Sequence, residues 1–393
     1  MMSKAFEGIK VLDLSQVLAG PSCGMQLALL GADVIKIEPP VGGDQMRDRV
    51  LESQFSPIGM AAGFLTMNIN KRSLALDIKT EQGKAILFDL IKEADAILHN
   101  FRAGVVDRLG LDYESVKKIN QDIIYVSITG YGQYGPKSMV AGHDLNYIGN
   151  AGLLSISMGR ENDTVVPPAL VADIAGGSYP AVINILLALR KRDLNKEGSY
   201  IDLSMTENLF PFMFWGLGSG FAHNKWPGNS DGVLSGGSPR YNIYKTSDGS
   251  YVAAAPLEDR FWNKFCEAIE LPKKFIKMQN EQEKVIQEIR KIIGQKEKNH
   301  WLDVFNKADC CCSIVKSIEE AIEQLKASLE GDDSANIASD LEVLTQEAMK
   351  LGEAIYKAQE SSQNTENENP ESNPEDDTIV DADFEEVEED KNT

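Results

Sequence analysis

The first part of the chain alternates between apolar runs and a stretch with helical spacing. Residues 9–14 (IKVLDL) are rich in branched apolar side chains and predict a buried strand. Residues 19–32 (AGPSCGMQLALLGA) predict a helix, with Pro21 near its first turn and Gly31 past its end. Residues 33–38 (DVIKIE) predict a second strand. This strand–helix–strand spacing predicts a parallel sheet with a right-handed crossover, because parallel neighbours need a long connection.

The same alternation continues toward the middle of the chain. The pattern predicts two further helices, over Glu81–Ala94 and about Asp173–Leu189, and three further strands, over Ala96–Asn100, Ile123–Thr129 and Tyr200–Met205. Repeated alternation of strands and helices is typical of α/β proteins with a doubly wound parallel sheet. We therefore predict an α/β fold with one large domain over residues 1–205.

The hydrophobic pattern changes after this domain. Residues 206–240 are rich in glycine and aromatic side chains and predict a long irregular excursion, either a plain linker or a functional loop. Residues 241–320 predict a smaller α+β domain that starts with a hairpin around Asp248-Gly249. Residues 321–359 have helical spacing. Residues 360–393 are acidic and rich in Asn and Pro, which is typical of disordered segments.

The charge of the chain is concentrated in its last part. The 393 residues carry a formal net charge of −21. Residues 319–393 contain 24 acidic and 4 basic side chains, a net of −20. The remaining residues are therefore almost neutral overall. No stretch is basic enough to be a nucleic-acid footprint, so we expect no nucleic-acid partner.

Cysteine usage and segment composition exclude several further classes. The five cysteines, three of them consecutive at residues 310–312, form no CxxC pair, so we expect neither zinc nor a disulfide framework. The N-terminal residues lack the apolar core of a signal peptide. The most apolar segment, Leu209–Ala222, is too short to span a bilayer. The sequence has neither a P-loop nor a GxGxxG motif, so we expect no nucleotide cofactor. Together these features predict a cytoplasmic protein with no membrane partner and no metal cofactor.

One stretch, residues 141–177, carries the residues most able to do chemistry. It holds His143, one of only four histidines, and Asp173, which lies at the start of a predicted helix. A carboxylate at a helix start accepts backbone N–H groups and lies at the positive end of the helix dipole. The residues alone therefore leave two interpretations open. Asp173 is a helix N-cap and His143 an ordinary loop histidine, or the two form an acid–base pair.

The motifs within this stretch are specific. The hexad GHDLNY (residues 142–147) and the segment PPALVADIAGG (residues 167–177) resemble the family III CoA-transferase and racemase superfamily, most closely the alpha-methylacyl-CoA racemases. The resemblance covers about residues 5–318. It implies a Rossmann-like CoA-binding domain over residues 1–205, a Gly-rich loop (SGGSPRY, in the 206–240 linker) that covers the thioester, and an interlocked homodimer.

The resemblance also implies which residues hold the substrate. Coenzyme A enters as part of the thioester substrate, so no separate cofactor is expected. Arginine suits its phosphates because the planar guanidinium donates two parallel hydrogen bonds. Ala103 stands where the family commonly has proline, which leaves the neighbouring charge in place. The residues that match CoA-contacting positions are Leu76, Asp77, Ile78, Lys79, Asn100, Phe101, Arg102, Arg108, Gly142, Asp144, Leu145, Asn146 and Tyr147.

At the acyl end, the resemblance implies epimerisation of the α-carbon of a 2-methylacyl-CoA thioester by 1,1-proton transfer through an enolate. His143 and Asp173 match the two acid–base residues, and Glu258 matches the glutamate that accompanies the histidine. Such transfer asks for groups with a pKa near neutrality, which suits histidine and a tuned carboxylate. The alternative is a family III CoA-transferase, in which an aspartate at the Asp173 position is the acyl-accepting nucleophile. His143 favours the racemase.

The C-terminal tail has a separate resemblance. From about residue 321 the sequence is similar to the end of DnaK-type heat-shock chaperones, with lid helices, a polar linker and an acidic terminus. A natural fusion and an artefactual join of two reading frames both remain open. A third function hypothesis follows, in which the chain is a chaperone-related interaction protein with an inactive enzyme body. The intact set of His143, Asp173 and Glu258 argues against it.

Deletion of residues 331–393 gives a first test. The tail has little apolar surface that matches the preceding body, so the deletion should leave enzymatic activity and the melting temperature nearly unchanged. Activity assays and thermal unfolding of the full-length and truncated chains measure this, and chemical denaturation gives the free energy of unfolding of each. A loss of more than about 2 kcal/mol, well above the usual effect of surface changes, would mean that the tail is part of the fold.

Overall fold

The computed structural model describes residues 4–47, 60–160, 163–167, 169–278 and 280–329. The chain divides into two compact units, Met1–Ser328 and Leu329–Thr393. Helix α13 (Ile318–Leu329) coincides with the beginning of the predicted helical tail. The rest of that tail, including the part with the chaperone-like resemblance, lies outside the described residues.

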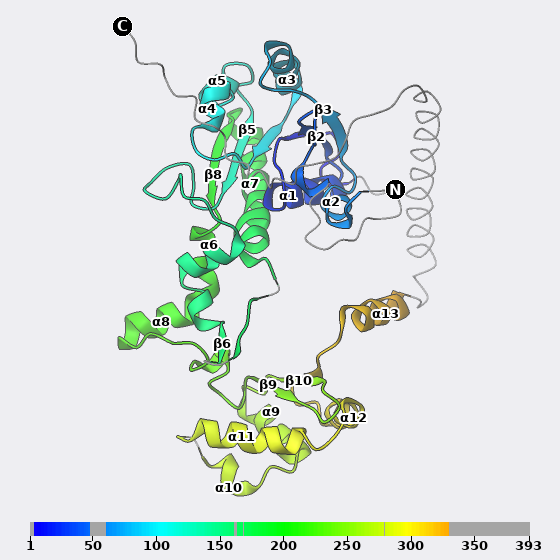
Figure 1. Cartoon of the computed structure of the whole chain (residues 1–393), viewed down its shortest axis with the longest axis vertical. Helices are drawn as coiled ribbons and strands as arrows, with labels where there is room; N and C mark the ends of the chain where they lie inside the picture. Colours follow the sequence, from blue (N-terminus) through cyan, green and yellow to red (C-terminus); the bar gives the residue numbers. More distant parts are fainter. Residues whose placement is uncertain (1–3, 48–59, 161–162, 168, 279, 330–393) are drawn as a thin grey trace, which may run out of the picture. The chain divides into compact units, whose positions relative to one another are not determined.

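The first unit contains a sheet of six parallel strands (Figure 1). Strand β1 lies in the middle, paired with β2 on one side and β4 on the other. The strand order is β3-β2-β1-β4-β5-β8. The strands are β1 (Lys10–Asp13), β2 (Asp33–Glu38), β3 (Arg72–Ala75), β4 (Ala96–His99), β5 (Ile124–Thr129) and β8 (Ser199–Ser204).

Helices cover both faces of this sheet. On one face, α1 (Ala19–Leu29), α6 (Asp144–Ala151) and α7 (Tyr179–Asn195) share a core with alternate strand residues such as Val126 and Ile128. On the other face, α3 (Glu81–Glu93), α4 (Val105–Leu109) and α5 (Tyr113–Lys117) pack on the intervening residues, such as Tyr125. Both faces of a strand such as β4 are therefore buried, which explains why its first three residues are all apolar. The predicted doubly wound α/β fold is confirmed.

A smaller antiparallel sheet follows in the sequence. Strands β9 (Asn242–Lys245) and β10 (Tyr251–Ala254) pair as the predicted hairpin around Asp248-Gly249, and β11 (Cys312–Ile314) pairs with β10. Gly249 has φ +85°, which glycine adopts without strain. A separate apolar core, with Phe265, Ile289 and Trp301 at its centre, joins this sheet to its helices. These are α9 (Asp259–Ala268), α10 (Lys273–Ile276), α11 (Gln282–Ile293) and α12 (Lys298–Ala308).

The segment 206–240 differs from its prediction. It was expected to lack compact elements, yet it contains the 3₁₀ turn η4 (Glu207–Met213), helix α8 (Phe214–His223) and the short turn η5 (Val233–Ser235). Gly220 allows close packing of this helix on a residue that follows it. A Cβ on Gly220 would lie 2.4 Å from the Trp226 ring. Glycine content therefore predicted a loop where tertiary packing forms a helix.

The helix after Asp173 also differs in detail. It begins as a π-helical turn, η3 (Ala172–Ser178), and continues as α7 (Tyr179–Asn195). Asp173 lies in the first turn and is not the N-cap, which is Val171. Single π-helical turns occur frequently at functional sites, and sequence spacing does not reveal them.

Helix α7 together with η3 is long and strongly apolar. In the part of the chain that the structure describes, Ala172–Asn195 is the helical stretch long and apolar enough to cross a membrane, and 44% of its apolar 18-residue window is buried inside the protein. Its buried residues, among them Ala181 and Ile185, belong to the core against the sheet. Core helices of globular proteins pass the same length and composition test, so this is weak evidence for a membrane span.

Buried charges lie at the carboxyl ends of β1 and β2. Asp13 Oδ2 is 2.7 Å from Lys71 Nζ, and both side chains are at most 1% exposed. Lys36 Nζ and Asp44 Oδ2 form a second pair at 2.7 Å, equally buried. Taking such charges out of water is costly unless each is paired. The two pairs therefore fix the positions of the segments that carry them.

The substitution Lys71→Met tests this dependence. It leaves the Asp13 carboxylate buried without its cation, so the free energy of unfolding should fall by about 3–5 kcal/mol. The matched control is Lys10→Met, which breaks the exposed Lys10–Glu93 pair and should leave stability unchanged, since exposed pairs contribute little. Urea titration of the two variants measures the difference. Equal stability of both would contradict a structural role for the buried pair.

Candidate active site

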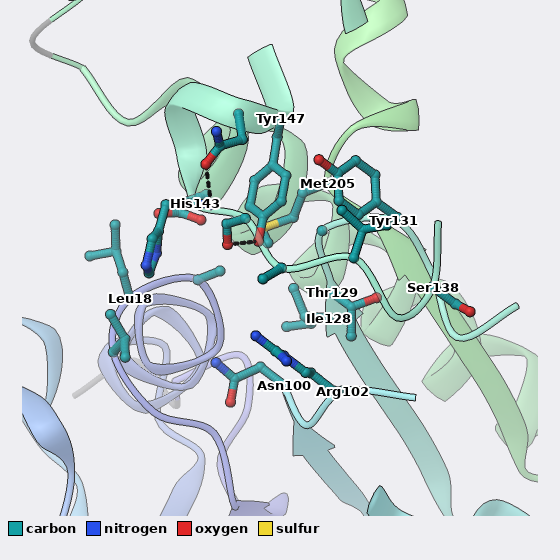
Figure 2. A pocket seen from close by; sticks show the side chains of 18 residues that line it. Leu18, Asn100, Arg102, Ile128, Thr129, Tyr131, Ser138, His143, Tyr147 and Met205 are labelled. Atoms are coloured by element: carbon teal, nitrogen blue, oxygen red, sulfur yellow. Dashed lines mark hydrogen bonds between the residues drawn. The ribbon is translucent and has the colours of Figure 1, made fainter. Parts of the chain in front are cut away.

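A cavity of about 510 Å³ opens where several parallel strands end (Figure 2). In open α/β sheets ligands bind outside the carboxyl ends of the strands, where the strand order reverses, here between β1 and β4. The loops after β1, β4, β5 and β8 all reach the cavity, as do α6 and η3. The lining residues are Val17, Leu18, Ala19, Asn100, Arg102, Ile128, Thr129, Gly130, Tyr131, Ser138, Val140, Ala141, Gly142, His143, Asn146, Tyr147, Asp173 and Met205.

His143 lies at the start of α6 and lines this cavity. It is the N-cap residue in an extended conformation, and its backbone N–H donates to Asn146 Oδ1 at 3.0 Å. Figure 2 shows the imidazole projecting from this helix start into the cavity. The Asn146 side chain therefore fixes the backbone from which the imidazole extends.

Asp173 enters the same cavity from the π-helical turn η3. Its backbone N–H donates to Asp144 Oδ1 at 2.9 Å, so the Asp144 carboxylate caps the turn. Burial, followed by the negative charge of Asp144, raises the pKa of Asp173 to about 7. Burial also raises the pKa of Asp144 above its usual range. Two neighbouring carboxyls in a partly desolvated site disfavour a second negative charge, so Asp173 is poised to exchange a proton near neutral pH.

Tyr147 closes one side of the cavity by close packing. Its hydroxyl donates to the Gly142 carbonyl, and its ring lies over Gly130, where a Cβ would come within 2.2 Å of the ring. Burial, and after it the charge of Asp173, raises the pKa of Tyr147 to about 12. The phenol therefore stays neutral and acts as a hydrogen-bond donor.

The loop between β1 and α1 forms another wall. Val17 has φ +71°, a left-handed conformation that is rare for a β-branched residue and costs about 1–2 kcal/mol. A hydrogen bond joins the start of α1 to η3, because Ser178 Oγ donates to the Ala19 carbonyl at 2.6 Å. The wall that carries Val17 and Ala19 is thus held against the turn that carries Asp173.

The structure places the expected CoA-contacting residues in two groups. Asn100, Arg102, Gly142, Asn146 and Tyr147 line the cavity. The others do not line it. These are Leu76, Asp77, Ile78 and Lys79 after β3, Phe101 and Arg108 after β4, and Asp144 and Leu145 in α6. Asp144 is buried and occupied with the backbone of η3, whereas Leu145 is exposed. CoA contact by these residues stays a prediction.

Glu258 lies elsewhere in the described structure. It is the N-cap residue of α9, is exposed, and does not line the cavity. The Gly-rich loop SGGSPRY, residues 235–241, does not line it either. The described residues contain no group of three or more His, Cys, Asp and Glu side chains that could hold a metal ion.

Several lining residues were missed in the sequence. Val17, Leu18 and Ala19 follow β1, Gly130 and Tyr131 follow β5, and Met205 follows β8. The signal that could have found them is their position directly after predicted parallel strands, whose carboxyl ends share one edge of the sheet.

The arrangement has a defined chemical capacity. An imidazole and a carboxyl, those of His143 and Asp173, border one cavity, and Arg102 supplies a cation on its wall. Apolar residues such as Ile128 and Met205 cover much of the remaining surface. A bound ligand would therefore meet an exposed imidazole and a partly buried carboxyl whose pKa is raised to about 7, which suits proton transfer to or from a weak acid.

Known proteins are similar to this chain in sequence. Residues 6–370 match the family model described as "CoA-transferase family III". The alpha-methylacyl-CoA racemase of Mus musculus is 33% identical over 322 residues, which cover 80% of this chain and 78% of that protein. The succinyl-CoA:glutarate CoA-transferase of Homo sapiens is 34% identical over 276 residues, 68% of this chain and 60% of that protein.

A solved structure agrees with these matches. A CAIB/BAIF family protein from Brucella suis superposes with a TM-score of 0.71 at 28% identity, covering 83% of this chain and 88% of that one. The family match runs past residue 318, where the sequence resemblance was expected to end, and the chaperone-like interpretation of the tail is unsupported. The cavity at the carboxyl ends of a doubly wound sheet and the match along most of the sequence together show that this chain belongs to CoA-transferase family III.

Proposed function

We propose that this protein is an acyl-CoA racemase that inverts the α-carbon of 2-methylacyl-CoA thioesters. One observation carries the proposal: His143 and Asp173 line a single cavity, and the pKa of Asp173 is raised to about 7. A group with this pKa accepts and returns protons at similar cost near neutral pH. The similarity to alpha-methylacyl-CoA racemases supports the same chemistry.

The proposed reaction proceeds by two proton transfers. For one enantiomer, the Asp173 carboxylate removes the α-proton, and the electron pair moves into the thioester carbonyl to give an enolate. The His143 imidazolium then protonates the α-carbon on the opposite face, which inverts it. For the other enantiomer the two residues exchange roles. Backbone N–H groups at Gly142–Asp144 or the adjacent helix start would stabilise the enolate oxygen.

The CoA moiety would lie along the carboxyl edge of the sheet. Arg102 lines the cavity, and Lys79 and Arg108 follow strands that end at the same edge. Cations at such positions suit the phosphates. Coenzyme A belongs to the substrate in this proposal, and no further cofactor takes part.

A family III CoA-transferase is the second candidate function. The similarity to a succinyl-CoA:glutarate CoA-transferase at 34% identity favours it as much as the racemase. In that reaction the Asp173 carboxylate would attack the thioester carbonyl and form an acyl-aspartyl anhydride with release of the CoA thiolate. His143 would then have no proton to move at the α-carbon, so the two reactions separate experimentally.

We also propose that the protein is cytoplasmic and forms a homodimer. Apolar side chains on α7 recur at helical spacing and are more than half exposed: Tyr179 (53%), Ile183 (56%) and Leu187 (62%). An apolar stripe of this kind fits a second copy of the chain better than water. Glu258, which does not line the cavity, would then meet the active site of the partner subunit.

Isotope exchange tests the function. The protein is incubated with (2R)- or (2S)-2-methylacyl-CoA in deuterated water, with and without an acceptor carboxylic acid. The racemase incorporates deuterium at the α-carbon as chirality is lost. His143→Ala should lower racemisation by at least about 10²-fold, the usual effect of removing a general base. Asp173→Asn should lower racemisation to a similar extent. Exchange of the α-proton should be lost in this variant for the enantiomer that Asp173 deprotonates, and in His143→Ala for the other enantiomer.

A matched control accompanies these variants. His223→Ala removes an exposed histidine that does not line the cavity and should leave the exchange rate unchanged. Transfer of CoA to the acceptor without α-exchange would support the transferase instead. Full racemase activity in His143→Ala would rule out the two-base assignment.

The raised pKa of Asp173 generates a pH prediction. For the enantiomer that Asp173 deprotonates, kcat/KM should fall as the pH drops below about 7, because the carboxylate becomes protonated. Asp144→Asn removes a nearby negative charge, while its amide oxygen still accepts the Asp173 N–H. Ionisation of Asp173 then becomes easier, its pKa falls, and the acidic limb of the profile should move to lower pH.

Asp202→Asn is the control for this shift. Asp202 is a carboxyl whose pKa burial also raises, and it does not line the cavity. Its variant should keep the wild-type pH profile. A limb that stays in place in Asp144→Asn would show that Asp144 does not set the proton affinity of Asp173.

A further inference from the structure

The loop from Ser15 to Ala19 contains the strained residue nearest to the proposed site. Val17, Leu18 and Ala19 line the cavity. Val17 has φ +71°, which its β-branched side chain disfavours. Such outliers persist only where the surrounding structure holds them, and they gather at functional sites. The question is which contact holds this one.

A buried carboxylate from another segment binds the strained residue directly. Asp44 Oδ1 accepts the backbone N–H of Val17 at 3.2 Å and that of Met46 at 2.9 Å. Asp44 is fully buried and does not line the cavity. Its other oxygen is 2.7 Å from Lys36 Nζ, and the ammonium also donates to the Ser15 carbonyl at 2.8 Å. One ion pair therefore contacts the loop at two points.

The position of Asp44 is itself fixed. It follows the turn at Gly42 and Gly43, both with positive φ. Its backbone N–H donates to Glu38 Oε2 at 3.0 Å, and Arg47 holds the same carboxylate through its Nε at 2.7 Å. The carboxylate that contacts Val17 is thus attached to the end of β2.

The rest of the loop is held from the other side of β1. Asn100 Oδ1 accepts the Gln16 N–H at 2.9 Å, and its Nδ2 donates to the Gln16 carbonyl at 2.7 Å. The Ser15 N–H donates to Asp13 at 3.0 Å. Successive backbone N–H groups of the loop are therefore each bound by a different side chain. Asp44 binds the one that belongs to the strained residue, Val17.

We propose that Asp44, neutralised by Lys36, is a positioning residue for thioester binding: it holds the Val17 peptide in its left-handed conformation, so that Val17–Ala19 form the wall of the cavity. The proposal rests on the proposed function, because it takes the cavity to be the thioester site. Asp44 acts through Val17 and does not itself touch the substrate.

The test removes the charges in pairs, so that no buried charge is left alone. Lys36→Met/Asp44→Asn keeps an amide oxygen for the Val17 N–H, whereas Lys36→Met/Asp44→Leu has nearly the same shape without an acceptor. The probe is S-(2-methylpropyl)-coenzyme A, a thioether that cannot react. Calorimetry gives its Kd, and thermal unfolding gives the melting temperature of each variant.

The asparagine variant should bind the thioether with a Kd within about threefold of the wild-type value, and the leucine variant at least about tenfold more weakly. A tenfold change corresponds to about 1.4 kcal/mol. Glycine adopts positive φ without strain, so in a Val17→Gly background the asparagine and leucine variants should differ by less than about threefold. A purely structural role for Asp44 would not produce this rescue.

Equal Kd values for the asparagine and leucine variants would overturn the proposal, as would an undiminished difference in the Val17→Gly background. Should the leucine variant not fold, Lys36→Met/Asp44→Ser takes its place, because the shorter side chain does not reach the Val17 amide.

Hydrogen exchange of the Val17 amide, followed by NMR, separates this proposal from the function. Exchange should be slow in the wild-type and asparagine proteins and fast in the leucine variant, whether or not a ligand binds. A wild-type protein that does not bind the thioether overturns the proposed function and the role of the loop as a thioester wall. Equal exchange of the amide in all three proteins overturns the hold of Asp44 on Val17.

Discussion

The parallel pairing of the six strands is the constraint on which the rest of this structure depends. Every crossover returns the chain to the same starting edge, so all carboxyl ends meet at the opposite edge. With β1 in the middle and neighbours added on both sides, the loops after β1 and β4 separate and leave a crevice. Residues far apart in the sequence, such as Val17, Arg102 and Met205, thereby line one cavity.

The edge that forms the cavity also concentrates buried charge. Asp13 with Lys71, and Lys36 with Asp44, are paired ions with almost no exposure at the ends of β1 and β2. Ion pairs of this kind contribute little net stability compared with apolar packing, but losing one partner is costly. Their consequence here is geometric. They hold polar backbone groups of the Ser15–Ala19 loop, which an apolar core would leave without partners.

The pair of carboxyls at Asp144 and Asp173 connects fold and chemistry most directly. Asp144 caps the π-helical turn through the Asp173 N–H, and its charge adds to burial in raising the pKa of Asp173 to about 7. A single residue of the GHDLNY motif therefore both orients the turn and adjusts the proton affinity of the group it presents. His143, which also lines the cavity, is the N-cap of the helix to which Asp144 belongs.

The sequence by itself determined the fold class, because apolar runs and helical spacing follow directly from which faces are buried. It also singled out His143 and Asp173 as candidate site residues, because each lies in a short motif of consecutive residues, and both line the cavity. Tertiary structure decided what depends on distant contacts. Asp144 caps the turn that carries Asp173, 29 positions away, and Val17 is held by Asp44 across 27 positions. None of these contacts leaves a periodic trace in the sequence, since each joins residues whose spacing is set by the fold and not by the helix or strand repeat.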